Sequence, residues 1–135
     1  MPARPDSGGT LNGARILIVD DEFVIAADLE FLFGDAGASV AVRTTLSAAL
    51  EAARSDEFTA ALLDIRLGTE SSEPVADVLA SRGIPFLFFS GQSVPDGMRA
   101  KFPNVRSLLK PARFGDLLSA TAELLNERPR TAPPD

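Results

Sequence analysis

The stretch Arg15-Ile16-Leu17-Ile18-Val19-Asp20-Asp21 is a short apolar run that ends in two carboxylates. A second run, Ala60-Ala61-Leu62-Leu63, ends in the same way at Asp64. Continuous apolar runs of this length indicate strands that are buried on both faces, as in a parallel sheet covered by helices. Because parallel strands end at a shared edge, the sequence predicts that these carboxylates line one pocket.

Strand-like and helix-like segments alternate along the rest of the chain. The pattern predicts a flavodoxin-like α/β fold, a (βα)5 three-layer sandwich whose parallel sheet has the strand order 2-1-3-4-5. That order places the first and third strands side by side. The expected strands are 15–20, 39–43, 58–64, 84–89 and 105–109, and the expected helices are 22–35, 46–53, 74–82, 96–102 and 114–125.

Several residues have the properties of helix ends. Asp21 is expected to cap the first helix, and Thr44 or Thr45 the second, because short polar side chains accept hydrogen bonds from free helix N–H groups. Gly37 is expected to end the first helix in a left-handed conformation. Residues 65–73 are expected to form a loop that leads to Pro74 in the first turn of the third helix.

The length of 135 residues suits one domain, expected at 14–126, with disordered segments at 1–13 and 127–135. No apolar run approaches the roughly 20 residues that span a bilayer, so no membrane insertion is expected. A formal net charge of −6 without a basic stripe argues against nucleic-acid binding. The absence of cysteine and of a charged-then-apolar leader favours a cytoplasmic protein.

The acidic residues at the predicted pocket favour a hard divalent cation. Three carboxylates, from Asp20, Asp21 and Asp64, repel one another unless a cation binds or a pKa rises. The chain has no cysteine or histidine, so the site offers only oxygen ligands, which suit Mg²⁺. Asp64 is the better candidate for a nucleophile that forms an aspartyl phosphate.

Two further polar residues end predicted strands. Ser90 ends the fourth strand and offers a hydroxyl, and Lys110 ends the fifth and offers a positive charge. Each residue taken alone is common in turns or on surfaces. Their joint placement at the edge that carries the carboxylates is much harder to obtain by accident, and it predicts a phosphoryl-binding site.

These motifs together resemble the receiver domain of two-component response regulators. The resemblance covers residues 14–126 and rests on four segments in order, Ile-Leu-Ile-Val-Asp20-Asp21-Glu22, Ala-Leu-Leu-Asp64-Ile-Arg-Leu, Phe-Phe-Ser90-Gly91 and Leu-Leu-Lys110-Pro111. It implies that Asp64 accepts a phosphoryl group from a sensor histidine kinase or a histidine phosphotransfer protein. It also implies that Ser90 and Lys110 contact that group and that the Lys110–Pro111 bond is cis.

The same resemblance implies a complete set of metal ligands. Asp20, Asp21, Asp64 and the backbone carbonyl of Arg66 would hold Mg²⁺. Arg66 occupies a position that tunes dephosphorylation in such domains, and its side chain is expected to cover the phosphoryl group or to pair with Glu70 or Glu73. We therefore hypothesise that Arg66 changes the rate of autodephosphorylation.

The segments from Asp64 to Asp77 and from Pro85 to Gly91 are similar to receivers of the FATGUY type. Such receivers are often standalone or paired with HWE or HisKA2 kinases. Two departures stand out: Gln92 or Ser93 replaces an aromatic residue, and Ser107 replaces the aromatic residue usual on the fifth strand. No output domain is expected after residue 126, so output would pass through partner binding, phosphorelay or phosphate-sink action, from a monomer or weak dimer.

Other functions remain open from the sequence. A flavodoxin-like cofactor binder would need a Ser-, Thr- and Gly-rich loop after the first strand, where this chain has Asp20-Asp21-Glu22. A phosphate-ester hydrolase would need a second aspartate at position 66, which is Arg. A pseudo-receiver that works without phosphorylation is the remaining alternative. A receiver catalyses its own phosphorylation and dephosphorylation, and no independent substrate turnover is expected.

Overall fold

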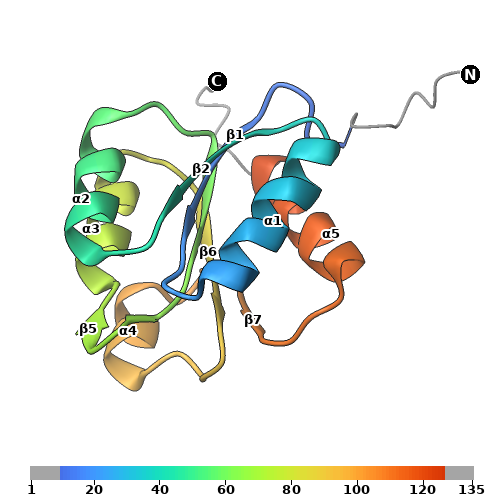
Figure 1. Cartoon of the computed structure of the whole chain (residues 1–135). Coiled ribbons are helices and arrows are strands. Elements are labelled where there is room, and N and C mark those ends of the chain that lie inside the picture. Colours follow the sequence, from blue (N-terminus) through green and yellow to red (C-terminus); the bar gives the residue numbers. More distant parts are fainter. Residues whose placement is uncertain (1–9, 127–135) are drawn as a thin grey trace, which may run out of the picture.

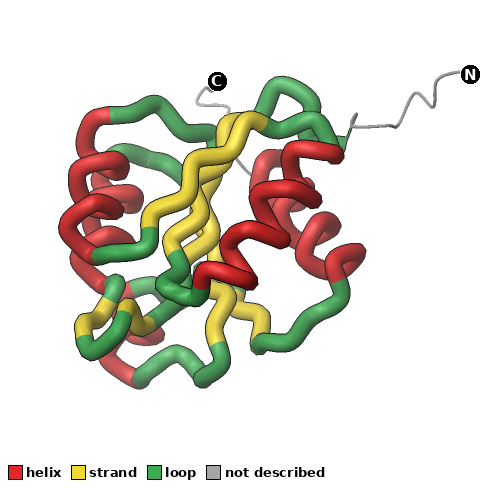
Figure 2. Tube along the Cα trace, in the orientation of Figure 1, coloured by secondary structure: helices red, strands yellow, loops and turns green. Residues whose placement is uncertain are grey.

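A computed structural model describes residues 10–126 of the chain. Five parallel strands form one sheet in the order β2-β1-β3-β6-β7, which confirms the predicted flavodoxin-like order (Figures 1 and 2). The elements are β1 (Arg15–Val19), α1 (Phe23–Asp35), β2 (Ser39–Arg43), α2 (Leu46–Ser55), β3 (Ala60–Leu63), β4 (Arg66–Leu67), β5 (Glu70–Ser71), α3 (Glu73–Ser81), β6 (Phe86–Ser90), α4 (Asp96–Lys101), β7 (Ser107–Leu109) and α5 (Phe114–Asn126).

Helices cover both faces of the sheet. Helices α1 and α5 pack on one face, and α2, α3 and α4 pack on the other (Figure 1). Along β1, Ile16 and Ile18 belong to the α1/α5 core, whereas Leu17 and Val19 belong to the core on the opposite face. Because successive side chains of a strand point to opposite faces, a continuous apolar run is what a doubly covered strand requires.

The inner face of α1 consists of Ala26, Leu29 and Phe33, spaced three and four residues apart. Phe33 is fully buried, and its ring centroid lies 5.4 Å from that of Phe114 on α5. This aromatic contact joins the two helices on their side of the sheet. Phe31, two residues earlier, is 72% exposed.

The helix ends agree with the sequence in two of three places. The side chain of Thr45 accepts a hydrogen bond from the Ala48 amide, as predicted for the cap of α2. Gly37 has φ +106° directly after α1 ends, as predicted. The prediction that Asp21 caps α1 was wrong, because Glu22 is the cap residue, it makes no side-chain cap bond, and the Asp21 carboxylate is engaged elsewhere.

Residues expected to form a plain loop contain a short antiparallel hairpin. Strands β4 and β5 pair Arg66 with Ser71 and Leu67 with Glu70, and Gly68 makes the turn with φ +65°. Leu67 is buried while Arg66 is exposed. Alternation over only two residues is too short a pattern to be read as a strand from sequence.

The ordered domain begins earlier than residue 14. Leu11 is 1% exposed, and its amide donates a hydrogen bond to the Ala36 carbonyl oxygen at the end of α1. The segments 1–9 and 127–135, where disorder was expected, lie outside the described residues. Among residues 10–126, no helix is long and apolar enough to cross a membrane.

Candidate functional site

The topology brings the five predicted side chains to one edge of the sheet. Val19 and Leu63 are register partners on the neighbouring strands β1 and β3, so Asp20 and Asp64 follow them side by side. Ser90 and Leu109 are partners on β6 and β7, so Lys110 follows next to Ser90. The residues that the sequence indicated therefore share one site although they come from four strands.

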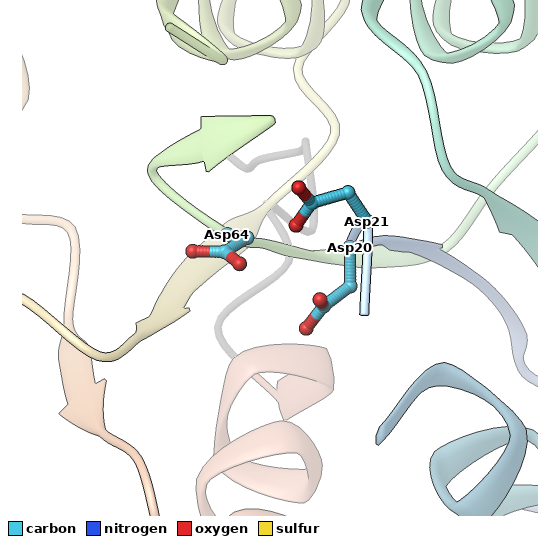
Figure 3. A group of neighbouring side chains, drawn as sticks. All are labelled: Asp20, Asp21 and Asp64. Atoms are coloured by element: carbon cyan, nitrogen blue, oxygen red, sulfur yellow. The ribbon is translucent and has the colours of Figure 1, made fainter. Parts of the chain in front are cut away.

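The three aspartates converge on a common space. Asp20, Asp21 and Asp64 each offer a carboxylate oxygen, and these oxygens all lie within 4.8 Å of one another (Figure 3). Asp20 and Asp64 are buried, and Asp21 is partly exposed. An all-oxygen donor set with this charge fits a divalent cation such as Mg²⁺.

Each oxygen of Asp64 has a donor from a different strand end. The Ser90 hydroxyl donates to Oδ1 over 2.7 Å, and the Lys110 ammonium donates to Oδ2 over 3.1 Å. Asp64 is 8% exposed, so these two bonds largely fix the direction in which its carboxylate points. A hydroxyl and an ammonium beside one carboxylate are the donors that a phosphoryl group on that carboxylate would need.

Lys110 is the cationic centre of the site. Its Nζ atom lies 2.8 Å from Asp20 Oδ2, 2.7 Å from Glu22 Oε1 and 3.1 Å from Asp64 Oδ2. An ammonium group has three protons, so three carboxylates engage all of them. Burial alone would lower the pKa of Lys110, but these hydrogen bonds, first with Asp20 and then with Glu22, raise it above the ordinary 10.5. The lysine is therefore charged at neutral pH.

Asp20 is the most deeply buried carboxylate of the site. Burial raises the pKa of Asp20 above its ordinary value, against the opposing effects of the Lys110 ammonium and the Glu22 amide. That amide donates to Asp20 Oδ1 over 2.9 Å. The negative charge of the buried Asp20 carboxylate is thus stabilised only in part, and a bound cation would stabilise it further.

The β4–β5 hairpin forms one wall of the site. The Gly68 amide donates to Asp21 Oδ2 over 2.8 Å, which joins the hairpin to the loop after β1. The hairpin and the ends of the strands enclose an open depression of about 550 Å³, whose lining includes Asp21, Asp64, Arg66, Ser90 and Lys110. The candidate nucleophile therefore faces a space that a donor group can enter.

Arg66 is exposed on the rim of this depression. Its guanidinium donates to the Thr69 carbonyl oxygen over 3.0 Å, within the hairpin turn. Glu73, one of its two expected partners, pairs with Lys101 instead. The expectation that the Arg66 backbone carbonyl binds the cation remains a prediction. The Lys110–Pro111 peptide bond is cis, as the resemblance implied.

Comparison with solved structures identifies the fold. A receiver domain protein (CheY-like) from Methanospirillum hungatei JF-1 is 25% identical, covers 85% of this chain and 95% of its own, and superposes with a TM-score of 0.78. A receiver protein from Sinorhizobium medicae WSM419 is 27% identical over 85% of this chain and 96% of its own, with a TM-score of 0.76. This is the receiver-domain fold.

A third similar structure is described with its metal. The receiver domain of a sensor histidine kinase from Pseudomonas aeruginosa PAO1 carries a magnesium ion coordinated in its active-site cleft; it is 18% identical over 85% of this chain and 99% of its own, with a TM-score of 0.74. No family model matches the sequence. No curated protein matches it either. The receiver assignment of the fold therefore rests on three-dimensional similarity.

Two participants in the site were not predicted from the sequence. Glu22 contacts Lys110, and Gly68 contacts Asp21. Glu22 could have been suspected, since it is the third consecutive acidic residue after β1. Nothing in the sequence, however, shows which positively charged side chain it contacts. The Gly68 contact depends on the hairpin, and a backbone amide leaves no mark in the side-chain pattern.

Proposed function

We propose that this chain is a response regulator receiver that accepts a phosphoryl group on Asp64. The donor would be a phosphohistidine of a sensor histidine kinase or of a histidine phosphotransfer protein. The observation that carries the proposal is the surroundings of Asp64, whose two oxygens receive hydrogen bonds from Ser90 and Lys110 beside two further carboxylates. The receiver fold of the similar structures is consistent with it.

The chemistry is a transfer between two nucleophiles. A carboxylate oxygen of Asp64 attacks the phosphorus atom, the P–N bond to the donor histidine breaks, and an acyl phosphate forms on Asp64. The histidine leaves with the electron pair of that bond. Lys110 and Ser90 would donate hydrogen bonds to the transferred oxygens, which gather negative charge in the transition state.

The metal's contribution would be electrostatic. Asp20, Asp21, Asp64 and the backbone carbonyl of Arg66 would hold Mg²⁺, which would supply positive charge to offset the charge on the phosphoryl oxygens. Asp20 and Asp21 would hold the cation without taking part in bond formation. Two carboxylates next to the nucleophile would repel an anionic donor without it, which gives the reaction its expected dependence on Mg²⁺.

The remaining features of the proposal concern partners. We infer a FATGUY-like receiver that works with a kinase of the HWE or HisKA2 type in the cytoplasm, without binding nucleic acid. Its output would be phosphorylation-dependent partner binding, phosphorelay or draining of phosphate from a shared kinase. Faster phosphotransfer from a purified HWE or HisKA2 kinase than from other histidine kinases would support the pairing, and equal rates would argue against it.

The deciding experiment uses a small phosphodonor. The protein is incubated with acetyl phosphate and Mg²⁺, and intact mass is measured with and without a chelator. We expect the mass of one phosphoryl group to be added, and we expect it to be absent in Asp64→Ala and present in Asp77→Asn, an aspartate on α3 outside the site. No gain of mass in the wild-type protein with any donor would favour the alternative, a pseudo-receiver that works without phosphorylation.

A further inference from the structure

Lys110 and a divalent cation would draw on the same two carboxylates. Two of the three carboxylates that Lys110 contacts, Asp20 and Asp64, belong to the cation-binding set. A carboxylate that contacts both an ammonium and a divalent cation brings two positive charges close together. Binding of the cation would therefore weaken the attraction of these two carboxylates for Lys110.

Among residues 10–126, Glu22 is the one carboxylate partner of Lys110 outside that set. Its Oε1 atom lies 2.7 Å from Lys110 Nζ, and its side chain is 57% exposed on the rim of the site. The Glu22 backbone is anchored, because its amide donates to Asp20 Oδ1 over 2.9 Å. Glu22 can thus hold the Lys110 ammonium at the edge of the site when the two buried carboxylates bind a divalent cation.

We propose that Glu22 is a positioning residue for Lys110 and thereby sets the affinity of the site for Mg²⁺. This inference rests on the proposed function, since it concerns the same site. With Glu22 present, the cation takes Asp20 and Asp64 while Lys110 keeps a charged partner. Without Glu22, the ammonium has only the two contested carboxylates, and the cation must displace it into solvent without a partner.

The local structure makes Glu22 suitable for substitution. Glu22 occupies the cap position of α1, but its side chain makes no capping hydrogen bond, so its removal does not expose a helix amide that it had satisfied. Asp28, on the same helix, is exposed and also negative, and it forms no ion pair among the described residues. It is therefore a matched control for the general loss of one negative charge.

The test is the dissociation constant of Mg²⁺, measured by isothermal titration calorimetry on the metal-free protein at fixed ionic strength. Substitution of groups that orient metal ligands typically costs ten- to a hundredfold in affinity, and we expect about tenfold weaker binding for Glu22→Ala. Glu22→Gln, which keeps a hydrogen-bond acceptor without the charge, should fall between that variant and wild type. Asp28→Ala should change the constant by less than about twofold, since exposed charges are screened.

A double-mutant cycle distinguishes an effect of Glu22 that acts through Lys110 from the general effect of losing one negative charge. In a Lys110→Met background, Glu22→Ala should weaken Mg²⁺ binding no more than Asp28→Ala does, because its effect passes through the lysine. Thermal unfolding of each variant checks that it is folded. Equal effects of Glu22→Ala and Asp28→Ala in the wild-type background would overturn the inference, and so would an undiminished Glu22→Ala effect in Lys110→Met or the absence of Mg²⁺ binding to the wild type.

The outcome is distinguishable from failure of the proposed function. If Asp64 is phosphorylated but Glu22→Ala binds Mg²⁺ like Asp28→Ala, only the inference about Glu22 fails. If Glu22→Ala weakens Mg²⁺ binding as expected but Asp64 accepts no phosphoryl group from any donor, the site is a cation site and the phosphoryl-transfer proposal fails. Both measurements use the full chain.

Discussion

The Ser90 hydroxyl donates a hydrogen bond of 2.7 Å to Oδ1 of Asp64 across the carboxyl edge of the sheet. The two residues are 26 positions apart in the sequence, and the pairing of β3 with β6 brings them close together. Both are almost fully buried, so their contact is fixed by the strands and not by flexible loops. This bond fixes the orientation of the Asp64 carboxylate, the proposed nucleophile. It also places a hydrogen-bond donor where the transferred phosphoryl group would lie.

Ser90→Ala should therefore slow phosphorylation of Asp64. Loss of one donor that stabilises developing negative charge typically lowers a rate on the order of a hundredfold, and we expect an effect approaching that size with acetyl phosphate as donor. Ser90→Thr keeps the hydroxyl and should react at close to the wild-type rate. The rates are measured by intact mass at fixed Mg²⁺. Equal rates for Ser90→Ala and wild type would remove Ser90 from the proposed mechanism.

Arg66→Ala should shorten the lifetime of the phosphorylated protein. The guanidinium lies on the rim of the depression that holds Asp64, and within the described part of the chain its hydrogen bond is to the Thr69 carbonyl oxygen. There it can bond a phosphoryl oxygen and exclude water, and losing one charged hydrogen bond corresponds to about a tenfold change in rate. The half-life is followed by intact mass after removal of the donor. An unchanged half-life would rule out this role.

Most of the fold was predictable because it depends on long apolar runs. The run from Ile16 to Val19 can only be buried on both faces, and that requirement fixes a parallel sheet with helices on each side. The functional side chains follow from the same logic, since Asp20, Asp64, Ser90 and Lys110 each come next to the end of a strand. Once the strand order is known, their proximity needs no further information.

The parts that were missed depend on contacts that leave no periodic signal. The hairpin at 66–71 has only two residues in each strand, and its effect on Asp21 passes through the backbone amide of Gly68. The Asp21 carboxylate, which was expected to cap α1, accepts its hydrogen bond from that amide instead. The early start of the fold at Leu11 depends on one buried side chain and one hydrogen bond to Ala36, which no pattern indicates.

Lys101 should contribute to stability in a way that depends on pH and salt. Its ammonium lies 2.7 Å from both Glu73 and Asp77, so it links α4 to α3. The hydrogen bonds with Asp77 and then Glu73 raise the pKa of Lys101 above its ordinary 10.5. A raised lysine pKa stabilises the folded state fully below 10.5, and this contribution is lost as the pH rises through the higher value in the folded protein.

Lys101→Met should accordingly lower the urea midpoint modestly at pH 7, because the ion pairs are exposed and screened. The difference from wild type should shrink in high salt and at alkaline pH above 10.5. Arg99→Met on the same helix is the control for loss of one positive charge. A pH-independent difference between Lys101→Met and wild type would show that the charge of Lys101 is not responsible.

Phe102 packs its ring against two phenylalanines of β6, next to the strand on which Ser107 stands where an aromatic residue is usual. Ser107 is the register partner of Phe88, and it is exposed. Phe102, at the end of α4, places its ring centroid 5.6 Å from Phe86 and 6.4 Å from Phe88. The three rings meet edge to face, a geometry that adds to the gain from burial. Helix α4 is thus held to β6, the strand that carries Ser90, by aromatic contacts.

Phe102→Ala should destabilise the protein by about 2–3 kcal/mol, which is less than a fully buried phenylalanine would cost, because Phe102 is only partly buried. Phe31→Ala, on the exposed side of α1, removes the same atoms and should change the free energy of unfolding by less than about 0.5 kcal/mol. Urea unfolding followed by far-ultraviolet circular dichroism measures both, since the chain has no tryptophan or tyrosine. Equal losses in the two variants would mean that the ring cluster does not hold α4 to the sheet.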